Sequence, residues 1–175
     1  MRFPHVFKEG KIGELTLKNR IIMPGMSTGL ASPDGEVTDQ LIRYYKEISR
    51  YLEKLGVDAI HASCGNYNSI DKVIESPIFE QGWRVYLAEA IKEVVQIPVI
   101  AVGNIREPKY VDNLLSEGKA DFIALGRAHI ADPEWCNKAL EGREKEIRMC
   151  ISCLHCTYTS SFESTDGCLY LTSRT

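Results

Sequence analysis

The fold is decided by residues 98–127, which read PVIAVGNIREPKYVDNLLSEGKADFIALGR. Two segments, 98–102 and 121–125, are apolar except for Asp121 at the start of the second, and they have the length and composition of buried strands. The segment between them starts with Pro108, ends at Gly118 and carries apolar residues at helical spacing, so it predicts a helix. A strand, a helix and a second strand in this order predict a parallel sheet joined by crossover helices.

The same alternation of strands and helices extends toward the N-terminus. Thr38 is a residue type that caps helix N-termini, and Gly56 suits the end of a helix. Four further elements with apolar faces are therefore expected: a strand at 20–23, a helix at 38–56, a strand at 57–62 and a helix at 87–95. The sequence thus predicts an α/β protein with four parallel strands.

Length and composition limit the classes of protein that the chain can belong to. The 175 residues suit one domain, and 44% of them are hydrophobic, as in ordinary globular cores. The net charge of −3 comes from mixed acidic and basic residues, which argues against nucleic-acid and membrane-surface partners. No apolar stretch is long enough to cross a bilayer, and Arg2 and His5 interrupt any apolar leader. We therefore expect a cytoplasmic protein.

Two of the predicted strands are followed directly by polar turns. Gly103 and Asn104 follow the run 98–102, and Gly126 and Arg127 follow the last strand. Ligand sites gather at the carboxyl ends of parallel strands, where glycine lets the backbone approach an anion and arginine binds phosphate oxygens. Alternatively, both glycines only close tight turns and Arg127 is a solvated surface charge. The residues alone favour neither interpretation.

The last quarter of the chain contains four cysteines in the pattern C-x2-C-x2-C-x11-C: Cys150, Cys153, Cys156 and Cys168. In a reducing compartment, clustered cysteines bind metals more often than they form disulfides. This spacing is typical of an iron-sulfur cluster, with a four-cysteine zinc site and unliganded thiols as the alternatives. Cys64 and Cys136 stand apart from the group and are interpreted as core or surface thiols.

Five segments resemble one known family. Residues 17–26 (LKNRIIMPGM) and 34–38 (DGEVT) resemble the opening of the old yellow enzyme family, in its NADH:flavin oxidoreductase and 2,4-dienoyl-CoA reductase-like branch. Residues 56–61, 98–103 and 120–128 resemble the sixth, seventh and eighth barrel strands of that family. The resemblance implies a TIM barrel with FMN and a 4Fe-4S cluster. It also implies a second domain that supplies electrons from a pyridine nucleotide for the reduction of activated C=C bonds.

The resemblance also assigns site residues. Four match the segment beside the flavin ring: Pro24, Gly25, Met26 and Ser27. Four match the phosphate turns: Gly103, Asn104, Gly126 and Arg127. The family context favours an iron-sulfur cluster over zinc at the four cysteines, which divides the chain into an FMN-binding barrel region at 1–147 and a cluster-binding segment at 148–175. No catalytic residue is assigned, and His61 and Tyr67 are interpreted as structural.

The chain also departs from the family pattern. The second to fifth strands are missing between Tyr45 and Ile48, which leaves family strands one, six, seven and eight of a partial TIM barrel. We therefore expect the family's proton donors to be missing with them, and we expect no nucleotide-binding domain after Cys168. Right-handed crossovers predict that strand 20–23 lies beside strand 57–62, so the sheet has two open edges.

Two copies of such a sheet can close each other. If the eighth strand of each chain pairs with the first strand of the other, eight strands form a homodimeric barrel without edges. Each junction then brings residues 24–27 of one chain to Gly103, Gly126 and Arg127 of its partner. The leading functional hypothesis is an FMN-dependent, iron-sulfur-containing oxidoreductase that acts on a small-molecule substrate. The alternatives are a non-enzymatic iron-sulfur electron-transfer module and a nonfunctional fragment.

Overall fold

The computed structural model describes residues 8–12, 15–18, 32, 37–64, 74–154 and 156. The fold is built around a parallel sheet of three strands, which are β3 (Ile60–His61), β4 (Val99–Ala101) and β5 (Phe122–Ile123). They are hydrogen-bonded in the order β3-β4-β5, with Ile60 beside Val99 and Ile100 beside Phe122. The predicted α/β fold with parallel strands is confirmed for this part of the chain.

Each strand is shorter than the apolar run that predicted it. Pro98 lies outside β4, although its carbonyl oxygen accepts a hydrogen bond from the Ile60 amide at 2.9 Å. The Ala124 amide likewise donates to the Ala101 oxygen at 2.8 Å, beyond the end of β5. The segment 121–125 is also less buried than predicted, because Phe122 is 58% exposed. A strand requires a regular ladder of backbone hydrogen bonds, which an apolar pattern does not by itself specify. The runs therefore overestimate the strand lengths.

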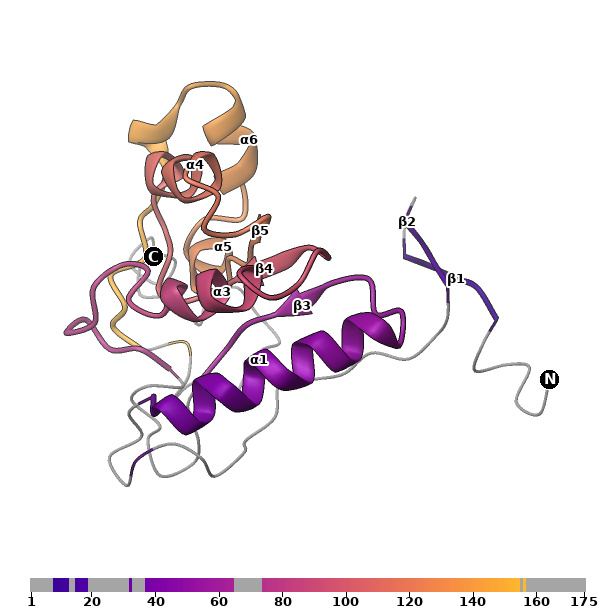
Figure 1. Cartoon of the computed structure of the whole chain (residues 1–175). Helices are drawn as coiled ribbons and strands as arrows, with labels where there is room; N and C mark the ends of the chain where they lie inside the picture. The colour runs from indigo at the N-terminus through magenta and orange to yellow at the C-terminus, as the bar shows by residue number, and fades with distance from the viewer. Residues whose placement is uncertain are drawn as a thin grey trace.

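Three helices connect and cover the strands: α1 (Asp39–Lys54), α3 (Val85–Lys92) and α4 (Pro108–Ser116). Helix α3 packs against β4, and α1 packs against α3 (Figure 1). Helix α1 begins where the sequence predicted, because Thr38 Oγ1 accepts a hydrogen bond from the Leu41 amide at 3.1 Å. It ends before Gly56, whose φ of +84° is a conformation that glycine adopts without strain.

The main core lies between the helices and the sheet. Val99, the first residue of β4, is fully buried, and Ala88 and Ile91 of α3 belong to the same cluster with exposed fractions of 1% and 3%. Leu114 of α4 belongs to the same cluster. The apolar faces of α3 and α4 therefore hold the strands in place and fix where the strands end.

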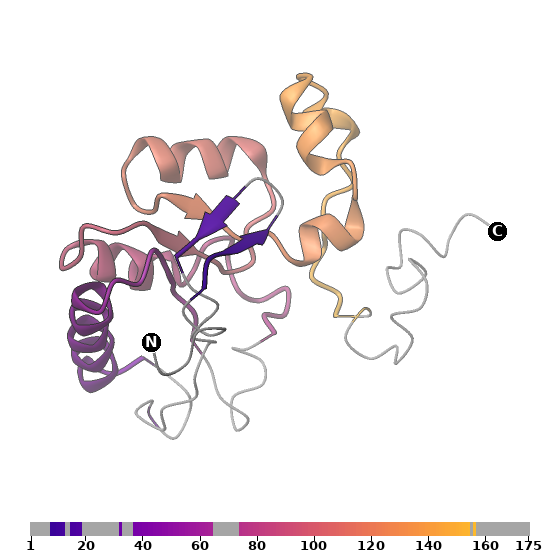
Figure 2. The same ribbon diagram turned by 90° about the vertical axis from the view of Figure 1, so that its right-hand side faces the viewer.

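A smaller unit follows β5. It consists of α5 (Arg127–Ala131), α6 (Trp135–Leu140) and the 3-10 helix η2 (Glu144–Glu146). Ala128, Trp135 and Ile147 form its own small core, which contacts Val111 and Leu125 of the main body. Figure 2 shows these helices to the side of the sheet, on the path toward the C-terminus. The unit carries the chain to residues 150–156, which we call the cysteine loop.

A hairpin that the sequence did not predict precedes these elements. Strands β1 (Gly10–Ile12) and β2 (Leu15–Leu17) pair antiparallel, with Lys11 opposite Thr16. Figure 1 shows the hairpin apart from the parallel sheet. The predicted strand at 20–23 lies outside the described residues, so its place beside β3 stays a prediction.

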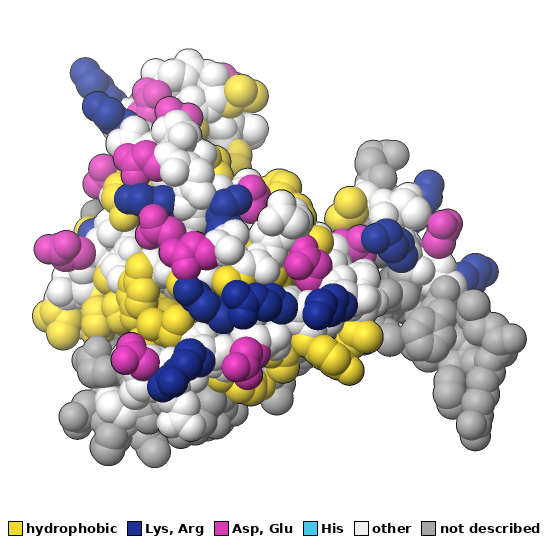
Figure 3. Space-filling model, in the orientation of Figure 1, with side chains coloured by type: hydrophobic (Ala, Val, Ile, Leu, Met, Phe, Trp, Pro, Cys, Tyr) yellow, Lys and Arg dark blue, Asp and Glu magenta, His cyan; other side chains and the backbone are white. Residues whose placement is uncertain are grey.

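The surface in Figure 3 shows Lys and Arg side chains interspersed with Asp and Glu, as the even charge composition predicted. Within the described ranges, no helix combines the length and the apolar character that a bilayer crossing requires.

Asp132 fixes the end of α5 relative to the segment before the cysteine loop. Its carboxylate is fully buried and accepts hydrogen bonds from Lys138 Nζ at 2.6 Å, the Arg148 amide at 2.9 Å and the Glu134 amide at 3.1 Å. Burial raises the pKa of Asp132, but the hydrogen bonds from Lys138 and the two amides outweigh burial and lower the pKa below its ordinary value of 3.8.

The lowered pKa of Asp132 predicts a loss of stability in acid. Because the folded-state pKa lies below the unfolded value, the stabilisation is complete above about pH 4 and is lost as pH falls through the folded pKa. We expect Asp132→Asn to reduce the acid slope of the unfolding free energy by up to about 1.4 kcal/mol per pH unit. Urea unfolding at several pH values measures this slope. Exposed Asp112 provides the control, Asp112→Asn, and an unchanged slope for Asp132→Asn would contradict the prediction.

Candidate functional site

The candidate site is a pocket at the carboxyl ends of β4 and β5, with a volume of about 440 Å³. Its wall extends from the loop before α3 to the cysteine loop. The polar and thiol-bearing side chains that line it are those of Glu75, Arg84, Asn104, Arg106, Arg127, Cys150 and Cys156. The remaining wall is formed by Gly126 and by apolar residues such as Val102, Ile105, Ala124 and Ile130. The pocket therefore lies where parallel sheets place their ligands.

Of the four predicted phosphate residues, three line the pocket and one supports it. Asn104, Gly126 and Arg127 lie in the wall, and a Cβ built on Gly126 would meet nothing within 4 Å. The backbone of Gly126 is thus open to close approach by a ligand. Gly103 has φ +144°, and a Cβ there would stand 2.5 Å from Arg84 Cγ. Glycine at 103 therefore makes room for the Arg84 side chain.

Arg127 is held in the pocket by Glu75. Arg127 Nη2 lies 2.6 Å from Glu75 Oε2, and Arg127 Nη1 donates to the Glu75 backbone oxygen at 2.6 Å. Only 15% of the Arg127 side chain is exposed. The alternative that Arg127 is a solvated surface charge is therefore wrong, because its guanidinium is fixed toward the pocket by two charge-assisted contacts.

The same glutamate binds a second arginine. Glu75, with 3% of its surface exposed, accepts hydrogen bonds from Arg84 Nη2 and from Trp83 Nε1, and Arg84 is itself 5% exposed. Arg84 Nη1 also donates to the Cys64 carbonyl oxygen at 3.1 Å, so Arg84 contacts the segment that follows β3. One buried carboxylate thus orients two guanidinium groups from different parts of the chain.

Sequence reasoning missed Glu75 and Arg84. Glu75 lies within the long polar loop predicted after strand 57–62, and Arg84 follows that loop directly. One signal could have found them: loops after barrel strands lie at the ligand end of the sheet. An acidic and a basic side chain in such a loop are therefore candidates for the ligand site at that end of the sheet.

The electrostatics of the pocket favour an anion. Three arginines line it, Arg84, Arg106 and Arg127, against the single carboxylate of Glu75 among the described residues of its wall. The formal balance is three positive charges minus one negative charge, or +2. Desolvation, and after it the positive charge of Arg84, lowers the pKa of nearby His61. A pocket of this size and charge fits the phosphate end of a nucleotide-like cofactor.

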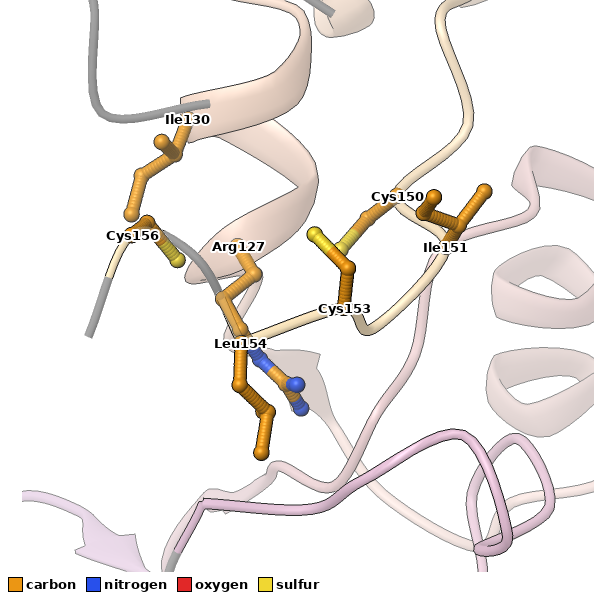
Figure 4. A pocket seen from close by; sticks show the side chains of 7 residues that line it. All are labelled: Arg127, Ile130, Cys150, Ile151, Cys153, Leu154 and Cys156. Atoms are coloured by element: carbon orange, nitrogen blue, oxygen red, sulfur yellow. The ribbon is translucent and has the colours of Figure 1, made fainter. Parts of the chain in front are cut away.

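Three of the four predicted ligand cysteines line the same hollow. Cys150, Cys153 and Cys156 line one small hollow together with Arg127, Ile130, Ile151 and Leu154, and Figure 4 shows their side chains around it. The lining contains thiols but no carboxylate or imidazole, a donor set suited to iron-sulfur clusters and zinc. Within the described residues no three potential ligands are close enough together to hold a metal ion. The fourth predicted ligand, Cys168, lies outside those residues.

The remaining predicted residues are placed as follows. Five residues lie outside the described ranges, so their assignments stay predictions: Pro24, Gly25, Met26, Ser27 and Tyr67. Cys64 lies three residues after β3, and its carbonyl oxygen accepts a hydrogen bond from Arg84. Cys136 lies on α6, with its Sγ 3.4 Å from His129 Nε2.

The comparison with known proteins agrees with this geometry. Residues 51–146, more than half of the chain, match the family model described as NADH:flavin oxidoreductase / NADH oxidase family. This chain belongs to that family. The predicted family resemblance is thereby confirmed, and the NADH:flavin oxidoreductase family places the chain among flavin-dependent oxidoreductases.

Three known proteins are similar to this family member over part of its length. The NADH oxidase of Thermoanaerobacter brockii is 58% identical over 108 residues, which are 62% of this chain and 17% of that protein. The cinnamate reductase of Clostridium sporogenes is 35% identical over 109 residues, 61% of this chain and 16% of that protein. The solved structure of 2-naphthoyl-CoA reductase superposes with a TM-score of 0.60 at 25% identity, over 64% of this chain and 17% of that one. The chain spans about a sixth of the length of these relatives.

Proposed function

We propose that this chain forms the FMN-phosphate and iron-sulfur region of a flavin oxidoreductase that reduces activated C=C bonds with electrons from NADH. The observation that carries the proposal is the arginine-lined pocket, whose wall includes two thiols of the predicted cluster ligands. The names of two similar proteins, an NADH oxidase and a cinnamate reductase, support the electron donor and the type of substrate.

Arg127, Asn104 and Gly126 are the residues proposed to hold the FMN phosphate. Arg127 presents a guanidinium that Glu75 already orients, and Gly126 leaves its backbone uncovered. A charged donor that is fixed before binding loses little conformational entropy when the anion arrives. FMN, when bound, supplies hydride and single-electron transfer. Residues 24–27 are proposed to lie beside the flavin ring, on the basis of family resemblance alone.

The cysteine loop is proposed to hold a 4Fe-4S cluster through Cys150, Cys153, Cys156 and Cys168. Thiolates are the ligands of such clusters, and the first three thiols already face a common hollow. The hollow also contains Arg127, and the thiol site and the phosphate site share four residues: Arg127, Ile130, Cys150 and Cys156. A cluster in this place would exchange electrons with flavin over a short path.

The experiment that tests flavin binding compares FMN with riboflavin, which lacks the phosphate. Equilibrium dialysis of the chain against each compound gives two dissociation constants. Recognition of the phosphate by charged donors predicts that FMN binds at least about tenfold more tightly than riboflavin. Equal affinities, or no binding of either compound, would contradict the proposed phosphate site.

We also propose the homodimer that the strand order predicts. Among the described strands β5 pairs only with β4, and Phe122 on β5 is 58% exposed. An open edge with an exposed aromatic residue is suited to pairing with a strand of a second copy. Sedimentation velocity of the FMN-saturated chain should give about twice the monomer mass of 19.7 kDa. A purely monomeric FMN-bound species would exclude the two-chain barrel.

A further inference from the structure

Strained backbone gathers where the cysteine loop meets the turn after β4. Three non-glycine residues in the described ranges have positive φ: Asn104 at +49°, Ser152 at +55° and Leu154 at +62°. Asn104 belongs to the turn, and Ser152 and Leu154 belong to the cysteine loop. Such conformations cost free energy and persist only where surrounding contacts hold them, so they often mark functional contacts.

Two hydrogen bonds hold the two segments together. Ser152 Oγ donates to Asn104 Oδ1 at 2.6 Å, and Arg106 Nη1 donates to the Cys150 carbonyl oxygen at 2.9 Å. We call these four residues the joint. Ser152 is completely buried, so its hydroxyl is committed to this contact and not to water.

The joint reaches Arg127 through Asn104. Arg127 Nη2 approaches Asn104 Oδ1 at 3.5 Å, and Asn104 Nδ2 donates to the Phe79 carbonyl oxygen at 2.9 Å. Both ends of the Asn104 amide therefore have partners, which fixes its orientation. The hydrogen bond from Ser152 thus helps to keep the side-chain oxygen of Asn104 beside the Arg127 guanidinium, which is proposed to bind the phosphate.

We propose that the joint couples the two sites, so that an iron-sulfur cluster at the cysteines strengthens the binding of FMN at the phosphate pocket. This inference rests on the proposed function. A cluster bound by the cysteine thiols would restrict the motion of the cysteine loop. The loop would then keep the hydrogen bond from Ser152 to Asn104, and Asn104 would stay beside Arg127. By linkage, FMN must strengthen retention of the cluster by the same factor.

The test measures FMN binding with and without the cluster. Anaerobically reconstituted protein, with iron and sulfide quantified, is compared with metal-free protein by equilibrium dialysis against FMN. Coupling through about one hydrogen bond predicts about fivefold tighter binding in the reconstituted chain. We define the affinity ratio as the FMN dissociation constant of the metal-free protein divided by that of the reconstituted protein. Ser152→Ala should still bind iron, sulfide and FMN, but its affinity ratio should be close to one. Ser116→Ala, an exposed serine on α4 that donates to the Asn113 oxygen, should keep the ratio of the parent chain.

A second variant keeps the test decisive. Ser152→Gly also removes the hydroxyl, and glycine adopts the φ of +55° without strain, so it replaces Ser152→Ala if that variant does not fold. An affinity ratio of one in a parent chain that binds both groups would overturn the coupling and leave the proposed function standing. A parent ratio retained in folded Ser152 variants would overturn the role of the joint. Failure of the parent chain to bind FMN or to retain iron would overturn both proposals.

Discussion

Replacing Glu75 with glutamine should lower the free energy of unfolding by about 3–5 kcal/mol. The Glu75 carboxylate is 3% exposed and pairs with Arg84 and Arg127, so glutamine removes the buried negative charge that both guanidinium groups contact. Removing one member of a buried ion pair is costly because the remaining charge stays away from water. Urea unfolding, followed by circular dichroism, measures the change.

The control for Glu75→Gln is Glu93→Gln. Glu93 pairs with Lys46 Nζ at 2.7 Å across α1 and α3, but its side chain is 63% exposed. Exposed ion pairs contribute little to stability, so we expect Glu93→Gln to lower the free energy of unfolding by less than about 1 kcal/mol. If the two substitutions cost the same, the buried network around Glu75 does not stabilise the loop in the way its geometry indicates.

Replacing Arg127 with methionine should weaken FMN binding by about a hundredfold. Arg127 is proposed to supply the charge-assisted donors to the phosphate, and methionine retains a long apolar chain but no donor. The affinity for riboflavin should stay the same, because riboflavin has no phosphate for Arg127 to bind. Equilibrium dialysis against both compounds measures the two effects separately.

Two variants complete the Arg127 experiment. Arg127→Lys keeps the charge but loses the planar fork, so its affinity for FMN should lie between those of the parent chain and Arg127→Met. Arg143→Met removes an arginine that bonds Glu141 and Glu146 away from the pocket, and FMN binding should not change. An equal loss of FMN and riboflavin binding in Arg127→Met would indicate a general structural defect and contradict a phosphate role.

The elements that local signals specify were predicted well. Helix α1 begins after Thr38 and ends before Gly56, because the cap hydroxyl and the glycine act within a few residues of the chain. Pro108 likewise starts α4, and Gly118 with φ +71° follows it. The three strands that the structure describes in the parallel sheet were placed correctly but predicted too long, because the segments that predicted them extend beyond the residues that form regular strands.

Other features depend on contacts between distant residues, and sequence patterns did not reveal them. The Glu75 side chain accepts a hydrogen bond from Arg127, which is 52 residues away in the chain, and no local sequence motif predicts such a pair. Gly103 was predicted as a phosphate residue, yet its missing side chain leaves room for Arg84. The contact of Ser152 with Asn104 also arises only once the cysteine loop packs against the sheet end.

The visible absorption spectrum of the anaerobically purified chain tests the central claim most directly, with iron, sulfide and released flavin quantified on the same sample. A chain that joins a phosphate pocket to a thiol hollow predicts flavin absorption together with iron and sulfide. Iron and sulfide without flavin would support the non-enzymatic electron-transfer module instead. A colourless protein without iron or flavin would contradict both redox functions.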